Sequence, residues 1–209
     1  MQGGMNFRIG DIMEETRKVK GAINLELTFN EPYFSKSGVD KESIKKYEIP
    51  FEKLKPIEKE LLLAAKKAME NAYNPYSHFY VGAAVLTREG KIIVGANVEN
   101  ASYGNTLCAE RTALFAANVQ GHGDNIIALA TIARGEDFDT EVPSAPCGLC
   151  RQAIIEFAQR SNQNIEVIFS NTEMTRIAVM KIKDLLPFAF GPADLNITDP
   201  GSLGVSKRK

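Results

Sequence analysis

The three cysteines of the chain occupy two short motifs that can together hold one metal ion. Cys108 is followed two residues later by Glu110, and Cys147 and Cys150 form a Pro-Cys-x-x-Cys motif. Three thiolates leave one of the four tetrahedral positions of Zn²⁺ for water, which is the arrangement of a catalytic zinc site. Glu110 is well placed to handle the protons of that water. The sequence therefore predicts one zinc ion per subunit and a reaction that uses water.

Two helix starts are needed to bring these residues together. Cys147 and Cys150 lie about 60° apart around a helix, so both sulfurs can face one point. Pro146 suits a helix start, where free N–H groups and the helix dipole stabilise a thiolate. Glu110 lies about 200° from Cys108 around an ideal helix, so both can reach one metal only in a first turn with Cys108 near the cap. We expect two helix N-termini to face one zinc.

Arginines beside the motifs are candidates for offsetting the negative charge of three thiolates. Three thiolate ligands make zinc less able to lower the pKa of its bound water, and hydrogen-bond donors to the sulfurs would counteract this effect. Arg111 follows Glu110, and Arg151 follows Cys150. Arg151 is equally well explained as a surface arginine of its helix.

Each motif taken alone has a structural explanation. Pro-Cys-x-x-Cys also occurs in zinc ribbons and redox proteins, but a ribbon needs a second Cys-x-x-Cys, and a redox motif leaves Cys108 and Glu110 unexplained. A carboxylate in the first turn of a helix is also stabilised by the helix dipole alone. The two motifs together favour the metal site.

Helices and strands alternate around these motifs. The order predicts an α/β fold, a three-layer α/β/α domain with a mixed five-stranded sheet. Its expected helices begin at 56 and cover 107–119 and 146–159, and its expected strands cover 80–87, 91–97, 125–133, 165–170 and 176–181. The nearly continuous apolar run at 125–133 predicts a strand covered on both faces.

Composition limits the possible partners and location. The 209 residues are 44% hydrophobic with a formal net charge of −1. A nucleic-acid partner is not expected without a basic excess, and no apolar run approaches the roughly 20 residues of a membrane span. With no export signal we expect a cytoplasmic protein whose cysteines stay reduced.

The chain is expected to have three parts. Residues 1–52 form an N-terminal extension of unassigned role, with a strand-like alternation at 22–29. Residues 53–193 form the catalytic domain. Residues 194–209 contain Pro, Gly and Ser and are expected to be a flexible tail.

The motifs resemble those of the zinc-dependent nucleoside and nucleobase deaminases. The first ligand there is often histidine, and a cysteine at 108 resembles the short-subunit, homotetrameric cytidine deaminases. The resemblance covers about residues 55–193. It also rests on Asn-Pro-Tyr-Ser-His-Phe-Tyr-Val-Gly-Ala-Ala at 74–84, Gly-Ala-Asn-Val-Glu-Asn-Ala at 95–101, Leu-Leu-Pro at 185–187 and Phe-Gly-Pro at 190–192.

The resemblance implies roles for several residues that hold the substrate. Phe79 would pack against a pyrimidine ring, and the backbone of Ala109 would contact the base. Asn97 and Glu99 would hydrogen-bond the ribose 3′-hydroxyl, which suits two residues on one face of a strand. On their own, these two residues are better explained as polar groups on a solvent-facing strand.

Aromatic residues would line the same pocket. Tyr76, Tyr103 and Phe190 occupy the corresponding positions, the last two across subunit boundaries. Phe190 is also explained as a core residue. His78 is a metal-binding residue type, but the family does not use this position as a ligand, and we interpret His78 as structural.

The activity implied is hydrolytic deamination of cytidine and 2′-deoxycytidine to uridine and 2′-deoxyuridine plus ammonia, a step of pyrimidine salvage. Glu110 would carry a proton from water to N3 of the ring and then to the departing amino group. One alternative is another aminopyrimidine nucleoside, such as blasticidin S, or a base in polynucleotide; the 3′-hydroxyl contacts favour a free nucleoside. A second alternative is a non-catalytic, zinc-stabilised interaction protein.

Overall fold

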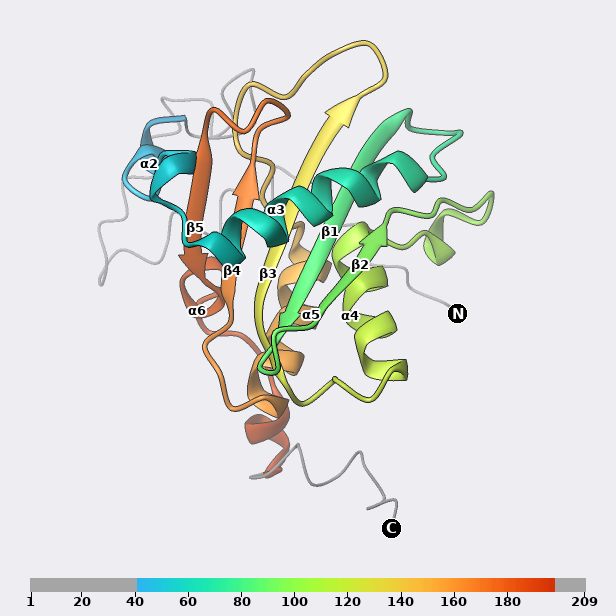
Figure 1. The fold of residues 1–209 in the computed structure, drawn as a ribbon. Coiled ribbons are helices and arrows are strands. Elements are labelled where there is room, and N and C mark those ends of the chain that lie inside the picture. Colours follow the sequence, from blue (N-terminus) through green and yellow to red (C-terminus); the bar gives the residue numbers. More distant parts are fainter. Residues whose placement is uncertain (1–40, 198–209) are drawn as a thin grey trace, which may run out of the picture. The chain divides into compact units, whose positions relative to one another are not determined.

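The computed structural model describes residues 41–197, so the predicted strand at 22–29 and most of the C-terminal tail lie outside the described residues. Five strands form one sheet in the order β2-β1-β3-β4-β5 (Figure 1). β3 and β4 are parallel, and the other neighbouring pairs are antiparallel, which confirms the predicted mixed sheet. The strands are β1 (Phe79–Thr87), β2 (Ile92–Ala96), β3 (Ile126–Gly135), β4 (Glu166–Ser170) and β5 (Ile177–Lys181).

Helices cover both faces of this sheet (Figure 1). One face carries α3, which packs over one buried apolar cluster. The other face carries α4 and α5, which together pack over a second cluster. The predicted three-layer α/β/α arrangement is confirmed. The α-helices are α2 (Lys41–Lys45), α3 (Pro56–Ala68), α4 (Ala109–Val119), α5 (Gly148–Arg160) and α6 (Ile182–Leu185). In residues 41–197 no helix is long and apolar enough to cross a bilayer.

The central strand β3 contributes side chains to both apolar layers. Leu129 belongs to the cluster under α4 and α5, whereas Ala128, Ala130 and Ile132 belong to the cluster under α3. Alternate residues of a strand point to opposite faces. This placement explains why the sequence of β3 is an almost unbroken apolar run, as predicted.

Two glycines allow the helices to lie directly on the sheet backbone. A Cβ at Gly82 would lie 2.0 Å from the carbonyl oxygen of Ala65 in α3. A Cβ at Gly95 would lie 2.4 Å from the backbone nitrogen of Ala113 in α4. Because β2 and α4 meet so closely at Gly95, the start of α4 is held near the end of β2.

Residues 47–49 pair with the outer edge of β5. The Ile49 N–H donates to the Ile177 carbonyl (2.8 Å), and the Val179 N–H donates to the Tyr47 carbonyl (3.1 Å). The Arg176 guanidinium pairs with the Glu48 carboxylate. This segment gave no strand or helix pattern in the sequence, since its backbone partners are provided by a strand more than 120 residues away.

Candidate metal and active site

The three cysteines lie together at one end of α4 and α5. Their Sγ atoms all lie within 4.8 Å of one another, with 3.9 Å between Cys108 and Cys147 and 3.4 Å between Cys147 and Cys150. Three thiolates on a tetrahedral zinc with Zn–S bonds of about 2.3 Å lie about 3.8 Å apart. The donors and their spacing therefore fit one zinc ion, and the predicted metal site is assembled.

His78 is not part of this cluster. Its Nδ1 lies 3.1 Å from a carboxylate oxygen of Glu136, and its backbone has a positive φ of 54°. Among the described residues, the three cysteines are the group of metal-binding side chains close enough to share an ion. The interpretation of His78 as structural agrees with this geometry.

The cysteines that open the two motifs are both helix N-cap residues. Cys108 precedes α4 with φ −71° and ψ 153°, and Cys147 precedes α5 with φ −66° and ψ 170°. Each helix thus begins two residues later than predicted, at Ala109 and Gly148. An N-cap side chain and the third helical residue face the same point, which is how Cys147 meets Cys150.

A two-residue bridge explains the late start of α4. Leu107 exchanges backbone hydrogen bonds with Val98, at 2.9 and 3.0 Å, so it is extended rather than helical. Val98 in turn follows the end of β2 at Ala96. The prediction that β2 reaches residue 97 was therefore wrong by one residue. Residues 97–99 instead follow the strand, and the pairing of Val98 with Leu107 positions the neighbouring Cys108.

Glu110 is the second residue of α4. It therefore lies in the first turn, where we expected it to be if Glu110 and Cys108 are to face one metal ion. Its side chain is buried, with 4% of the residue exposed. Burial raises the pKa of the Glu110 carboxyl to about 7, and the negative charge of the Cys108 thiolate acts in the same direction. A carboxyl with this pKa can accept and donate a proton near neutral pH.

Arg111 points back toward the first cysteine. Its Nη2 donates to the Thr106 carbonyl (2.9 Å) and to the Cys108 Sγ (3.9 Å). A hydrogen bond from the Cys150 thiol lowers the pKa of Cys108 to about 5, and Arg111 also lowers it. Arg111 therefore has the predicted geometry of a donor to a sulfur.

Arg151 does not have this geometry. Its Nε donates to the Pro146 carbonyl (2.8 Å), and its Nη1 donates to the Leu185 carbonyl (3.1 Å). The expectation that it is a candidate donor to the thiolates was wrong, because its guanidinium is directed to two carbonyls instead. It fastens the backbone before Cys147 to α6.

Asn97 and Glu99 hold the backbone around Phe79. The Asn97 side chain is buried; its Oδ1 accepts from the Val81 N–H (2.9 Å) and its Nδ2 donates to the Phe79 carbonyl (2.8 Å). Glu99 accepts from the N–H groups of Tyr76 (2.9 Å) and Ser77 (3.2 Å) with one oxygen, Oε2. Both side chains keep unused hydrogen-bonding capacity, since an amide has four sites and a carboxylate about four.

The predicted aromatic residues are largely exposed. Tyr76 and Tyr103 pack edge to face with ring centroids 5.6 Å apart. Phe190 is 60% exposed, which argues against a place in the core of this chain, and the Gln152 side chain donates to its carbonyl (2.8 Å). Ala109, by contrast, is fully buried at the start of α4.

Sequence reasoning missed the partner of Phe79. The ring of Phe138 lies 6.3 Å from the ring of Phe79, between centroids, and covers Gly135. Phe138 is the one aromatic residue in the acidic stretch Glu-Asp-Phe-Asp at 136–139. A lone aromatic side chain among loop carboxylates was the signal that could have identified it.

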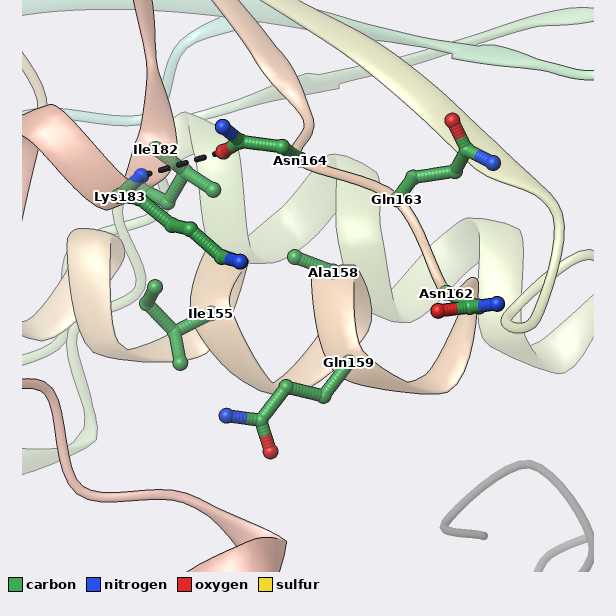
Figure 2. A pocket seen from close by; sticks show the side chains of 8 residues that line it. All are labelled: Ile155, Ala158, Gln159, Asn162, Gln163, Asn164, Ile182 and Lys183. Carbon is green, nitrogen blue, oxygen red and sulfur yellow. Dashed lines mark hydrogen bonds between the residues drawn. The ribbon is translucent and has the colours of Figure 1, made fainter.

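A separate cavity lies at the opposite end of α5 (Figure 2). It has a volume of about 270 Å³ and lies between the end of α5 and the start of α6. No residue predicted for the metal or substrate site lines it. Its lining consists of Ile155, Ala158, Gln159, Asn162, Gln163, Asn164, Ile182 and Lys183.

A three-layer α/β/α domain with three converging cysteines and a buried glutamate in one first turn defines a zinc-binding domain of the deaminase type. Residues 56–163 match the cytidine and deoxycytidylate deaminase zinc-binding region. The chain therefore belongs to this family.

Proteins with established names are similar to most of this domain. A cytidine deaminase of Halalkalibacterium halodurans is 43% identical over 136 residues, which are 65% of this chain and 96% of that protein. One of Sporosarcina psychrophila is 45% identical over 136 residues, or 65% of this chain and 93% of that protein. A crystal structure of cytidine deaminase from Burkholderia pseudomallei is 46% identical, with a TM-score of 0.56, and the match covers 63% of this chain and 97% of that one.

Proposed function

We propose that this chain is a cytidine deaminase that hydrolyses the exocyclic C4–N bond of cytidine and 2′-deoxycytidine. The products are the corresponding uridines and ammonia. The observation that carries this proposal is the cluster of three sulfurs within 4.8 Å beside a buried glutamate in the first turn of α4. The similarity to proteins named cytidine deaminase along nearly their whole length supports the same substrate class.

The chemistry begins with the metal ligands. Cys108, Cys147 and Cys150 would hold the zinc, and two of them sit at helix starts, where their thiolate forms are favoured. The bound zinc supplies Lewis acidity that makes water nucleophilic near neutral pH. Arg111 lowers the negative charge on the Cys108 sulfur by donating to it.

Glu110 moves the protons of the reaction. Its carboxylate takes one proton from the attacking water and delivers it to N3 of the pyrimidine, which makes C4 more electrophilic. It then takes the remaining proton of the added water from the hydroxyl group now on C4 and delivers it to the amino group, which leaves as ammonia. A pKa raised to about 7 suits both directions, because neither protonation state is strongly favoured.

The substrate pocket is proposed around the same helix start. Phe79 packs against the pyrimidine, and the backbone of Ala109 contacts the base. Asn97 and Glu99 use their remaining hydrogen-bonding capacity on the ribose 3′-hydroxyl. In this chain Asn97 also braces the strand that carries Phe79, and Glu99 braces the turn just before it, so both position the pocket as well as line it.

The biological setting forms part of the proposal. The chain acts as a homotetramer with one zinc per subunit, and exposed Tyr76, Tyr103 and Phe190 line the pocket, the last two reaching the site of a neighbouring subunit. It works in the cytoplasm in pyrimidine salvage, without nucleic-acid or membrane partners. Its catalytic domain covers 53–193, with an extension at 1–52 and a flexible tail at 194–209.

The proposal is tested with the full chain by measuring zinc content and loss of cytidine absorbance together. Cytidine, deoxycytidine, blasticidin S and single-stranded DNA are assayed side by side. One zinc per chain with turnover of the first two substrates is expected. A zinc-containing, folded chain with no turnover of any substrate would contradict the proposal and favour an interaction protein.

A further inference from the structure

Two threonines from distant segments form a closed hydrogen-bond pair at the end of β3. The Thr140 N–H donates to Thr172 Oγ1 (2.8 Å), and the Thr172 N–H donates to Thr140 Oγ1 (3.0 Å). Both hydroxyls also donate to the carbonyl of Ala133, at 3.1 and 2.9 Å. Thr172, which follows β4, is 4% exposed, so this pair ties the loop after β3 to the sheet in a water-poor setting.

The loop held in this way, residues 136–141, lies beside His78 and Phe79. Glu136 faces His78 at 3.1 Å, and Phe138 packs on Phe79 and over Gly135. The Gly135 N–H donates to the Phe138 carbonyl (2.8 Å), which folds the loop back on the strand. Phe138 itself is 62% exposed, so little apolar contact fixes its position beyond these neighbours.

The far end of the loop has separate anchors. The Ser144 N–H donates to the Ser170 carbonyl (3.1 Å), and Arg151 donates to the Pro146 carbonyl (2.8 Å). Cys147 is therefore held by contacts that do not pass through Thr140 or Thr172. The threonine pair can be broken without removing these restraints on the metal ligands.

We propose that Thr140 and Thr172 are positioning residues for the pyrimidine-binding side chain of Phe79. They hold residues 136–141 in place, so that the Phe138 ring packs against the Phe79 ring. This inference rests on the proposed function, in which Phe79 contacts the base. The pair acts on substrate binding, so it affects KM, whereas kcat and zinc content depend on Glu110 and the separately anchored cysteines.

The test compares Thr172→Val, which keeps the side-chain shape but removes the hydroxyl, with Thr172→Ser, which keeps the hydroxyl. In Thr172→Val the loop loses this anchor, and KM for cytidine should rise about five-fold, which corresponds to about 1 kcal/mol of binding free energy. The Ser variant should stay near the parent value. Thr140→Val and Phe138→Ala, at less buried positions, should raise KM in the same direction and serve if Thr172→Val fails to fold.

A second readout does not depend on activity. Amide hydrogen exchange of peptides covering 136–141 should be faster in both Val variants, with exchange in 148–160 and zinc content unchanged. A folded Thr172→Val protein with unchanged KM, or with kcat, KM and zinc all altered together, would overturn the inference. Failure of the parent chain to deaminate cytidine would instead contradict the proposed function, and the exchange data would still test the loop anchor.

Discussion

Cys108 and Cys147 occupy equivalent positions in two different helices, because each is the N-cap residue and their Sγ atoms lie 3.9 Å apart. Two positive helix ends thus meet at the sulfurs. The usual N-cap residues are Ser, Thr, Asp and Asn, whose oxygens bond to N–H groups of the first turn. Cysteine at both caps leaves the side chains available for a metal.

Replacing Cys147 by alanine should remove the zinc site. Two sulfurs and water are a weaker shell than three sulfurs, so zinc content should fall well below one per chain and activity should fall with it. Metal analysis after dialysis measures this, and Leu149→Ala, an exposed change within the same motif, is the control. Full zinc occupancy in Cys147→Ala would show that the cysteine cluster is not the metal site.

Replacing Glu110 by glutamine should abolish turnover while zinc and substrate still bind. Loss of a general acid or base usually costs about 10²- to 10⁴-fold in rate, and Glu110 would serve as both. Steady-state assays with zinc analysis measure the effect. Glu156→Gln on the exposed face of α5 should behave like the parent, and near-normal activity of Glu110→Gln would refute its assignment.

Replacing Arg111 by glutamine should shift zinc release to higher pH. Arg111 helps to hold the pKa of the Cys108 thiol at about 5; without it this pKa rises, and protons compete with zinc at a higher pH. A chromogenic chelator records the midpoint of release. Arg151→Gln is the control, because it removes donors to carbonyls only, and it should leave the midpoint unchanged. An unchanged midpoint in Arg111→Gln would show that the arginine has no influence on the Cys108 sulfur.

Glu58 should contribute a pH-dependent part of the stability. Burial acts to raise its pKa, but hydrogen bonds from the side chain and backbone of Lys55 lower it below the ordinary 4.5. Its contribution is therefore present above pH 4.5 and is lost as the pH falls through the lowered pKa.

Urea unfolding measures this contribution. Glu58→Gln should lower the free energy of unfolding by about 1 kcal/mol at pH 7, and the deficit should narrow as the pH falls below 4.5. Glu60→Gln, on an exposed position of the same helix, is the control. A deficit that does not change with pH would assign the effect to packing instead of charge.

Gly95 should not tolerate a side chain. A Cβ there would lie 2.4 Å from the backbone of α4, which has to move away from β2. Overpacking of this kind typically costs about 1–3 kcal/mol, so Gly95→Ala should lower the melting temperature. Gly104→Ala, with open space around its Cβ, should melt like the parent; equal melting temperatures for both would exclude the close contact.

The mixed sheet and the metal cluster could be predicted because their signals are local. The apolar run of β3 and the Cys-x-x-Cys spacing each lie within a few residues, so periodicity and ligand chemistry identify them. The helix starts were predicted two residues early, because the extended pairing of Leu107 with Val98 depends on a segment nine residues away.

Features that depend on distant partners could not be predicted. Arg151 stands beside a ligand in sequence, but its acceptors include the carbonyl of Leu185, 34 residues away. Thr140 and Thr172 are ordinary loop threonines until the sheet brings them together. Composition and spacing have no information about such pairs, because side-chain direction is fixed only by packing.

The pairing of residues 47–49 with β5 has a consequence for any shortened form of this protein. A chain that began at residue 53 would present the hydrogen-bonding groups of Ile177 and Val179 as an open sheet edge. Open edges recruit strands from other molecules, and intermolecular pairing would then compete with folding. The catalytic domain as defined by similarity alone is therefore expected to aggregate, whereas a form that begins at residue 41 keeps its edge protected.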